Sequence, residues 1–235
     1  MPDARYDGFA TWYDEVVSDF TEPFTSVLAA RVAGVAEPGA VVVDVGCGTG
    51  FVFDALRARG LEPIGVDLSA DQLRIARERG VAVVRADAAL LPVRDAAIGV
   101  AVGAFIHTDL DDFSSAAAEV ARVLHPGGRF VYLGTHPCFV GPFIKRAAER
   151  DTRELVVRRG YGDTRLSFDG SRPSGLSSRV GFRSRSLAAL LNAFLDAGLR
   201  IESCEELDTR GEPWVAEPDD QTIVPWNVLL VAAKS

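Results

Sequence analysis

Acidic side chains end three apolar stretches of the chain, and a glycine-rich turn follows the first of them. Asp44 lies in VVVDVGCGTG, Asp67 in GVDLS and Asp87 in VVRAD. If these stretches are neighbouring parallel strands, the three acids lie at one edge of a sheet, where ligands of open α/β sheets bind. Carboxylates accept hydrogen bonds and repel a pyrophosphate. The acids therefore favour a ligand that carries amine and hydroxyl donors.

The turn in VVVDVGCGTG has glycines at alternate positions, Gly46, Gly48 and Gly50. A strand that passes through such a turn into a helix brings unpaired backbone N–H groups and the positive helix end to one place. The dinucleotide fingerprint of NAD-binding proteins needs a glycine where this chain has Phe51, and Gly50 falls one place early. Packing alone is the structural alternative. The spacing favours a nucleotide-like cofactor other than NAD.

Strand-like and helix-like stretches alternate along most of the chain, which predicts an α/β fold with a parallel sheet covered on both faces. Expected strands are 40–45, 62–68, 81–87, 98–106, 125–134, 199–207 and 226–234. A helix after the fourth strand would be capped by Asp111 or Asp112, and another is expected at 186–198. Residues 137–183 break the pattern, with a short helical piece around 144–157, and are too long for a connecting loop.

Four motifs in order, DVGCGTG, GVDLS, ADAALLPV and ARVLHPGGRFVY, resemble the class I S-adenosyl-L-methionine (SAM)-dependent methyltransferases, and most closely the small-molecule methyltransferase type 11 group. The resemblance covers about residues 6–134. It implies a Rossmann-like, mostly parallel seven-stranded sheet with its last strand antiparallel, and SAM as cofactor with S-adenosyl-L-homocysteine as product. One departure is Ala96-Ala97, where the family usually has Phe-Asp.

The resemblance also assigns residues to the cofactor. By this assignment the methionine part of SAM is lined by Gly46, Cys47, Gly48 and Gly50, and Asp44 supports the loop. The ribose is held by Asp67, and the adenine is flanked by Leu68 and Gln72. The amino group of the adenine is read by Asp87 and Ala88, and Tyr13 covers the cofactor.

Composition and charge limit the domain organisation and the classes of partner that we expect. A chain of 235 residues suits a single domain, which we expect to comprise a helical cap at 1–37, the sheet domain and a lid or acceptor-binding insertion at 137–183. A net charge of −8 argues against nucleic acid as a partner. The start does not look like a signal peptide, and no apolar stretch is long enough to span a membrane. Three scattered cysteines imply neither a disulfide framework nor a metal site, which suits the cytoplasm. We expect a monomer or a homodimer.

Candidate catalytic residues are His107 and His136, which follow the fourth and fifth expected strands and so point toward the cofactor edge. Either could act as a general base or orient the acceptor, although a strand-end histidine is often only a hydrogen-bonded loop residue. Tyr6 is the third candidate, because it belongs to an aromatic N-terminal segment that, in the family, closes over the site.

The charge of the insertion bears on the kind of acceptor that the protein binds. Residues 145–185 hold eleven Lys and Arg against five Asp and Glu. This is either a solvated face or a lid that attracts an acidic acceptor, and its aromatic residues could build an apolar pocket.

We therefore predict methyl transfer from SAM to a small organic acceptor, a bulky aromatic compound of the natural-product type. The alternatives are a SAM-binding protein with non-methylating chemistry, such as a cyclase, and a regulatory role.

Overall fold

A seven-stranded sheet forms the centre of the computed structural model, which describes residues 4–146, 155–158, 160–168, 175–215 and 224–235. The strand order is β3-β2-β1-β4-β5-β9-β8. Strands β1 to β5 pair in parallel, and β9 runs antiparallel to both of its neighbours. The strands are β1 (Val41–Val45), β2 (Glu62–Asp67), β3 (Ala82–Arg85), β4 (Ile98–Ala104), β5 (Leu124–Thr135), β8 (Leu199–Leu207) and β9 (Asn227–Lys234). The predicted sheet, with its antiparallel last strand, is confirmed.

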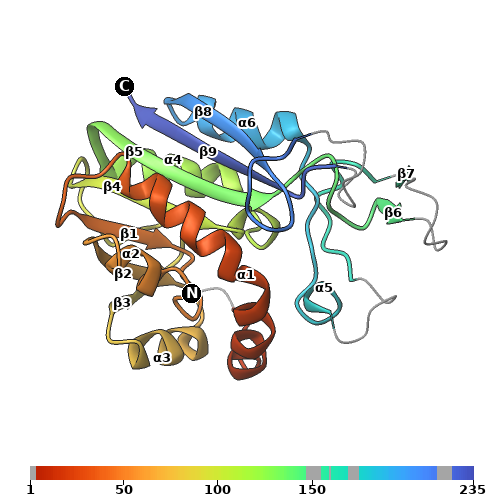
Figure 1. Cartoon of the computed structure of the whole chain (residues 1–235), viewed down its shortest axis with the longest axis horizontal. Helices are drawn as coiled ribbons and strands as arrows, with labels where there is room; N and C mark the ends of the chain where they lie inside the picture. Colours follow the sequence, from red (N-terminus) through yellow and green to blue (C-terminus); the bar gives the residue numbers. More distant parts are fainter. Residues whose placement is uncertain (1–3, 147–154, 159, 169–174, 216–223) are drawn as a thin grey trace.

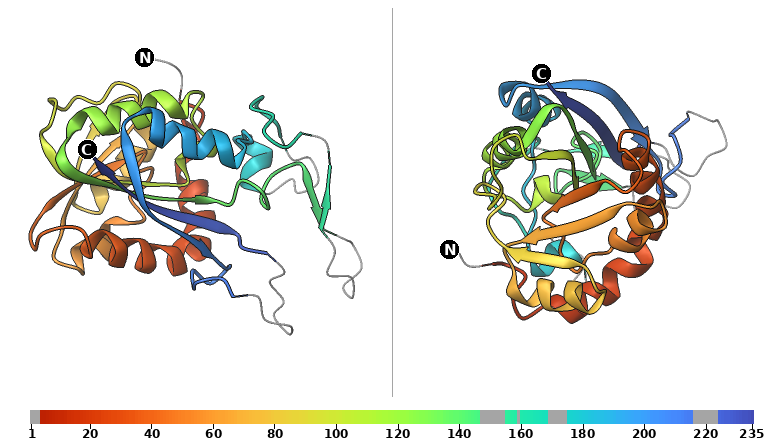
Figure 2. Two further views of the ribbon diagram at one scale, coloured as in Figure 1. Left: turned by 90° about the horizontal axis from the view of Figure 1, so that it is seen from above. Right: turned by 90° about the vertical axis from the view of Figure 1, so that its left-hand side faces the viewer.

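Helices cover both faces of the sheet, as Figures 1 and 2 show. One face packs against α1 and α2, and the other packs against α4 and α6. Neighbouring strand residues alternate between the two cores, because successive side chains of a strand point to opposite faces. The helices are α1 (Ala10–Ala33), α2 (Phe53–Arg57), α3 (Ala70–Glu78), α4 (Phe113–Val123), α5 (Leu176–Arg179) and α6 (Leu187–Asp196), and a short 3₁₀ turn, η1, spans Ile106–Thr108.

Three helices begin at side chains that cap them. Asp112 accepts a hydrogen bond from the backbone N–H of Ser115, and it is the cap expected near the start of α4. Ser69 caps α3 and Ser186 caps α6 in the same way. Each cap satisfies a backbone donor that the first turn of a helix leaves unpaired. The cap of α3 also fixes where the chain turns after β2, beside the glycine loop.

The short helix predicted around 144–157 is wrong in the part of the segment that the structure describes. Strand β6 (Ile144–Arg146) there pairs antiparallel with β7 (Leu155–Val157). Two adjacent valines in β7 favour a strand over a helix. Figure 1 shows this hairpin beyond one end of the sheet, on the same side as α5. Several residues of the 137–183 insertion lie outside the described ranges.

Candidate cofactor and acceptor site

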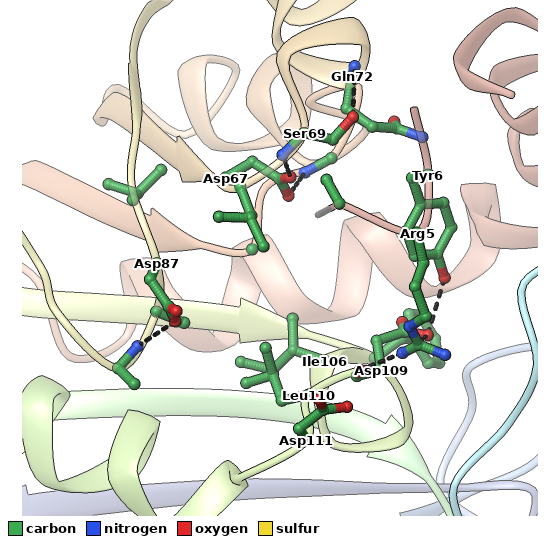
Figure 3. Close-up of a pocket in the computed structure, with 18 of the residues that line it drawn as sticks. Arg5, Tyr6, Asp67, Ser69, Gln72, Asp87, Ile106, Asp109, Leu110 and Asp111 are labelled. Carbon is green, nitrogen blue, oxygen red and sulfur yellow. Dashed lines mark hydrogen bonds and ion pairs between the residues drawn. The ribbon is translucent and has the colours of Figure 1, made fainter. Parts of the chain in front are cut away.

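A pocket of about 350 Å³ lies at the carboxyl ends of β1, β2 and β4. Its volume is at the lower end of the range for small-molecule sites. Figure 3 shows Asp87 on one side, Asp67 and Ser69 on the second, and Tyr6 with Asp109 opposite Asp87. The lining residues come from the N-terminal segment and α1, the ends of β2 and β4, the loops after β1, β2, β3 and β4, the first turn of α3, and residue 183.

Asp67 organises the wall beside the glycine loop. One carboxylate oxygen, Oδ2, accepts a hydrogen bond from the backbone N–H of Gly48 at 2.9 Å, and Oδ1 accepts one from Ser69 at 2.8 Å. Burial raises the pKa of Asp67, and these backbone donors counteract the rise. Each carboxylate oxygen can accept more than one hydrogen bond, so Asp67 retains acceptor capacity for a ligand in the pocket.

The glycines of the loop have different reasons to be glycine. Gly46, Gly48 and Gly50 all have positive φ, between 54° and 78°. A Cβ on Gly46 would lie 2.5 Å from Ile106 Cγ2, whereas one on Gly48 would project toward Gln72 and Tyr13 with no atom nearer than 3.6 Å. Gly46 therefore permits close packing of two loops. Because Gly48 has no side chain, a ligand in the pocket can approach the backbone of the loop.

Beneath the loop, a buried carboxylate has no hydrogen-bond partner. Asp44 is 1% exposed, and neither of its oxygens is hydrogen-bonded within the described part of the chain. Burial, with a smaller contribution from Asp67, raises its pKa to about 8. Both polar atoms of the buried Gln72 amide, on the pocket wall, also lack partners there. Such buried polar groups fit a ligand with donors and positive charge.

Asp87 lies on the side of the pocket opposite Tyr6. Its Oδ1 accepts a hydrogen bond from Ala89 N at 2.9 Å, which shapes the turn after β3. Ala86, Ala88 and Ala89 line the pocket beside it. This small, apolar wall with one carboxylate suits a flat ring that carries an amino group.

At the other side, Tyr6 and Asp109 connect the N-terminal segment to the loop after β4. Tyr6 donates a hydrogen bond from its hydroxyl to Asp109 Oδ1 at 2.9 Å, and its ring packs edge-on against Tyr13 with centroids 5.1 Å apart. Arg5 donates to the carbonyl oxygen of Asp109 and lies 3.6 Å from the carboxylate. Burial raises the pKa of Asp109 to about 6, although Tyr6 and Arg5 both lower it.

A methyltransferase domain model matches residues 43–132, which hold the glycine loop, Asp67, Asp87 and Asp109. The central part of the chain is thus similar to a methyltransferase domain. Among curated proteins, the malonyl-[acyl-carrier protein] O-methyltransferase of Serratia marcescens is 33% identical over 101 residues, which are 42% of this chain and 40% of that protein. This chain thus spans less than half of that relative's length.

Solved structures share the fold of the methyltransferase domain. A SAM-dependent methyltransferase from Mesorhizobium loti superimposes with a TM-score of 0.67 at 24% identity, covering 87% of this chain and 96% of that one. The [4+2]-cyclase SpnF superimposes with a TM-score of 0.61 at 22% identity, covering 90% and 80%. The predicted fold family is therefore confirmed.

The methyltransferase pocket fits SAM, whose sulfonium, amino and hydroxyl groups match the carboxylates around it. Most residues predicted to bind the cofactor line the pocket: Tyr13, Gly46, Gly48, Asp67, Leu68, Gln72, Asp87 and Ala88. Three do not. Cys47 is 1% exposed, and its Sγ packs toward Gly65, while Gly50 packs against the Phe53 ring. Asp44 lies beneath the loop, consistent with the supporting position expected for it.

Neither predicted catalytic histidine reaches the pocket. His107 is buried in the core, where its Nδ1 is hydrogen-bonded to the hydroxyl of Tyr132, and burial with the charge of Arg185 lowers its pKa to about 3. His136 Nε2 pairs with Glu206 at 2.8 Å, and its Nδ1 accepts the N–H of Cys138. The expectation that a strand-end side chain points into the cofactor site fails for both. The turn after β4 carries His107 into the core, whereas His136 still continues β5, with its backbone N–H bonded to Trp226 O, and its ring pairs with Glu206 of β8 outside the pocket lining.

The turn after β4 explains why residues other than His107 face the pocket. Phe105 has φ = 61°, rare for a bulky residue, and lines the pocket. This strained residue leads into η1, so His107 turns into the core while Ile106 and Asp109 face the pocket. Strain at such a position is typical of functional sites. Asp109 was missed from the sequence, although an acid just after an apolar strand was the signal that identified Asp67.

Arginines hold this loop in place. Arg183 donates its backbone N–H to Thr108 O at 3.1 Å and its guanidinium to the Asp111 carboxylate. Arg185, 7% exposed, donates to the carbonyl oxygens of Leu110 and Asp111. Together with Arg5, these side chains and N–H groups bind four consecutive carbonyl oxygens, from residue 108 to residue 111. We call this set the arginine clamp.

The aromatic residues of the insertion do not line this pocket in the described ranges. Phe143 is buried and packs against Tyr161, with ring centroids 5.4 Å apart. The aromatic rings that line the site are Tyr6, Tyr13 and Phe105. In the described residues, no group of three or more histidine, cysteine or acidic side chains could hold a metal ion. No helix among them is long and apolar enough to cross a membrane.

Proposed function

We propose that this protein transfers a methyl group from SAM to a small organic acceptor, with a bulky aromatic compound of secondary metabolism as the favoured class. One observation carries the proposal: a single continuous pocket is lined by the carboxylates Asp67 and Asp87 and, at its other side, by Tyr6 and Asp109. Phe105 and the two tyrosines supply flat apolar surface there. The three free cysteines, of which Cys47 is buried, suit the cytoplasm, where we place the reaction.

SAM, when bound, supplies an electrophilic methyl group on a positively charged sulfur. The protein's own contribution is to hold cofactor and acceptor in line at close distance, which can account for much of the rate. We propose that Asp67 binds the ribose hydroxyls, that Asp87 with Ala88 reads the adenine, and that Gly46 and Gly48 let the methionine part approach the backbone. Tyr13 then covers the cofactor from α1.

The test supplies the protein with SAM labelled in its methyl group and a small-molecule extract, and follows the label by mass spectrometry. We expect a labelled product and stoichiometric S-adenosyl-L-homocysteine. Asp67→Ala should abolish transfer through lost cofactor affinity, whereas Asp54→Asn, on an exposed position of α2, should leave it unchanged. SAM binding without label transfer in any fraction would refute methyl transfer and favour the cyclase alternative, for which SpnF provides a precedent of the fold.

A further inference from the structure

The acceptor side of the pocket has its own polar centre, distinct from the carboxylates near the glycine loop. Asp109 lines the pocket, and its side chain is 29% exposed, so the carboxylate is accessible from inside the site. The carboxylate contacts of Asp109 with Tyr6 and Arg5 both involve Oδ1. Oδ2 thus has acceptor capacity toward the pocket. Figure 3 shows Tyr6, Arg5 and Asp109 gathered on the side away from Asp87.

Both described cations that line the pocket, Arg5 and Arg183, are paired with carboxylates of the protein, Asp109 and Asp111. Arg5 donates to the carbonyl oxygens of Asp109 and Val180, and Arg183 donates to Thr164 O and to the Asp111 carboxylate. The guanidinium of Arg179 lies 4.2 Å from the centre of the Trp12 ring, outside the pocket lining. Among the residues that the structure describes, an acidic acceptor would therefore meet carboxylates without an unpaired cation to offset them, at a cost in free energy.

We propose that the Tyr6–Asp109 pair recognises the acceptor: Asp109 Oδ2 accepts a hydrogen bond from a hydroxyl or amine of the acceptor, and the site selects such donors over carboxylates. The inference rests on the proposed methyl transfer. Tyr6 and Arg5 are positioning residues, because they hold Oδ1 and leave Oδ2 directed at the ligand. The arginine clamp fixes the backbone from which Asp109 projects.

The same contact supplies a path for the proton. As the acceptor oxygen or nitrogen forms its bond to the methyl carbon, the carbon–sulfur bond breaks and its electron pair stays on sulfur. The proton of the acceptor moves to Asp109 Oδ2 and then to water. A carboxyl group with its pKa raised to about 6 is closer to the value that suits a base at neutral pH than an ordinary aspartate is.

The experiment measures the binding of two probes with the same ring system, 2-naphthol and 2-naphthoate, to protein saturated with S-adenosyl-L-homocysteine at neutral pH. A hydrogen bond to a charged group contributes about 1.5–3 kcal/mol, so 2-naphthol should bind the wild-type protein at least about tenfold more tightly. Asp109→Asn should reduce this preference to less than about threefold, because the amide carries no charge. Tyr6→Phe should give an intermediate preference, and Asp54→Asn should keep the wild-type value.

Binding of S-adenosyl-L-homocysteine alone to each variant separates this inference from the proposed function. We expect Asp109→Asn to bind it as tightly as the wild type, which also shows that the variant is folded. Loss of that affinity would assign Asp109 to the cofactor and overturn the inference. Equal binding of the two probes, binding of neither, or an unchanged preference in Asp109→Asn would overturn it as well. Absence of methyl transfer, by contrast, would refute only the proposed function.

Discussion

The hydroxyl of Tyr6 lies 2.9 Å from Asp109 Oδ1, across 103 residues of sequence. This hydrogen bond closes the pocket between the N-terminal segment and the loop after β4. Because one partner precedes the sheet and the other follows its fourth strand, the acceptor side of the site exists only in the folded chain.

Methyl transfer should fall as the pH decreases through about 6, because Asp109 then becomes protonated and loses its ability to take a proton. Tyr6→Phe removes a hydrogen bond that lowers this pKa, so the acidic limb should move to higher pH by on the order of one unit. The charged and titratable groups that line the pocket with Asp109 are Arg5, Tyr6, Tyr13, Asp67, Asp87, Asp111, Asp112 and Arg183. The measurement is kcat/KM against pH for the acceptor, with methyl-labelled SAM as donor. An acidic limb in the same place in both proteins would contradict the assignment.

Gly48→Ala and Gly50→Ala should fail in different ways. Both positions have positive φ, which costs about 1–2 kcal/mol for alanine. At Gly48 the new methyl group would project into the pocket, so cofactor affinity should drop by about tenfold or more. At Gly50 the methyl group would lie 2.4 Å from the Phe53 ring, so the free energy of unfolding should fall by about 1–3 kcal/mol more. Calorimetric titration and urea unfolding of both variants test this; the reverse pattern would disprove it.

Tyr132→Phe should affect stability rather than catalysis. The substitution keeps the ring in the core and leaves His107 Nδ1 without its partner, at a cost of about 1–3 kcal/mol. Methyl transfer well below the melting temperature should stay within about threefold of the wild type, since neither residue lines the pocket. Chemical unfolding and turnover are compared on the same preparation. A large loss of turnover with unchanged stability would restore a catalytic role to His107.

SAM binding should release protons. Asp44 has its pKa raised to about 8 and is therefore mostly protonated at neutral pH, and a sulfonium cation nearby favours the ionised form. S-adenosyl-L-homocysteine, without that charge, should release less, and Asp44→Asn should remove the difference. Titration calorimetry in buffers of different ionisation enthalpy measures the released protons. Equal release on binding SAM and S-adenosyl-L-homocysteine by the wild type would exclude this role.

The same pKa has a consequence for stability. Because the folded-state pKa of Asp44 lies above the unfolded value of about 4, the unfolded chain releases this proton first. The contribution of Asp44 to the free energy of unfolding is therefore complete below about pH 4 and is lost as the pH rises to about 8. In Asp44→Asn this part of the pH dependence should vanish, which unfolding experiments across that range can check.

The sheet and the cofactor side of the pocket could be predicted from the sequence because they depend on local signals. Alternating strands and helices determine the layers, and an acid at the end of an apolar strand marks the edge where ligands bind. Asp67 and Asp87 both line the pocket as expected. Cys47 and Gly50 show the limit of a motif: Gly46 and Gly48 of the same loop line the pocket, whereas these two pack away from it, and only their packing partners decide which.

The acceptor side could not be predicted in the same way. His107 and Asp109 are two residues apart, but their side chains point in different directions. The turn that separates them follows Phe105, which has a positive φ. Sequence periodicity continues a strand but does not reveal where it stops and how the chain then turns. The partners of Asp109, Tyr6 and Arg5, are more than one hundred residues away, so no local pattern connects them.

The arginine clamp separates two kinds of change that this protein can undergo. The glycine loop and its acids lie in residues 43–91, whereas the backbone around Asp109 is held by Arg5 from before the sheet and by Arg183 and Arg185 from the segment that leads into α6. The two sides of the pocket therefore depend on different parts of the chain. Substitutions at residues 109–112 would change the surface that an acceptor meets without touching the cofactor loop.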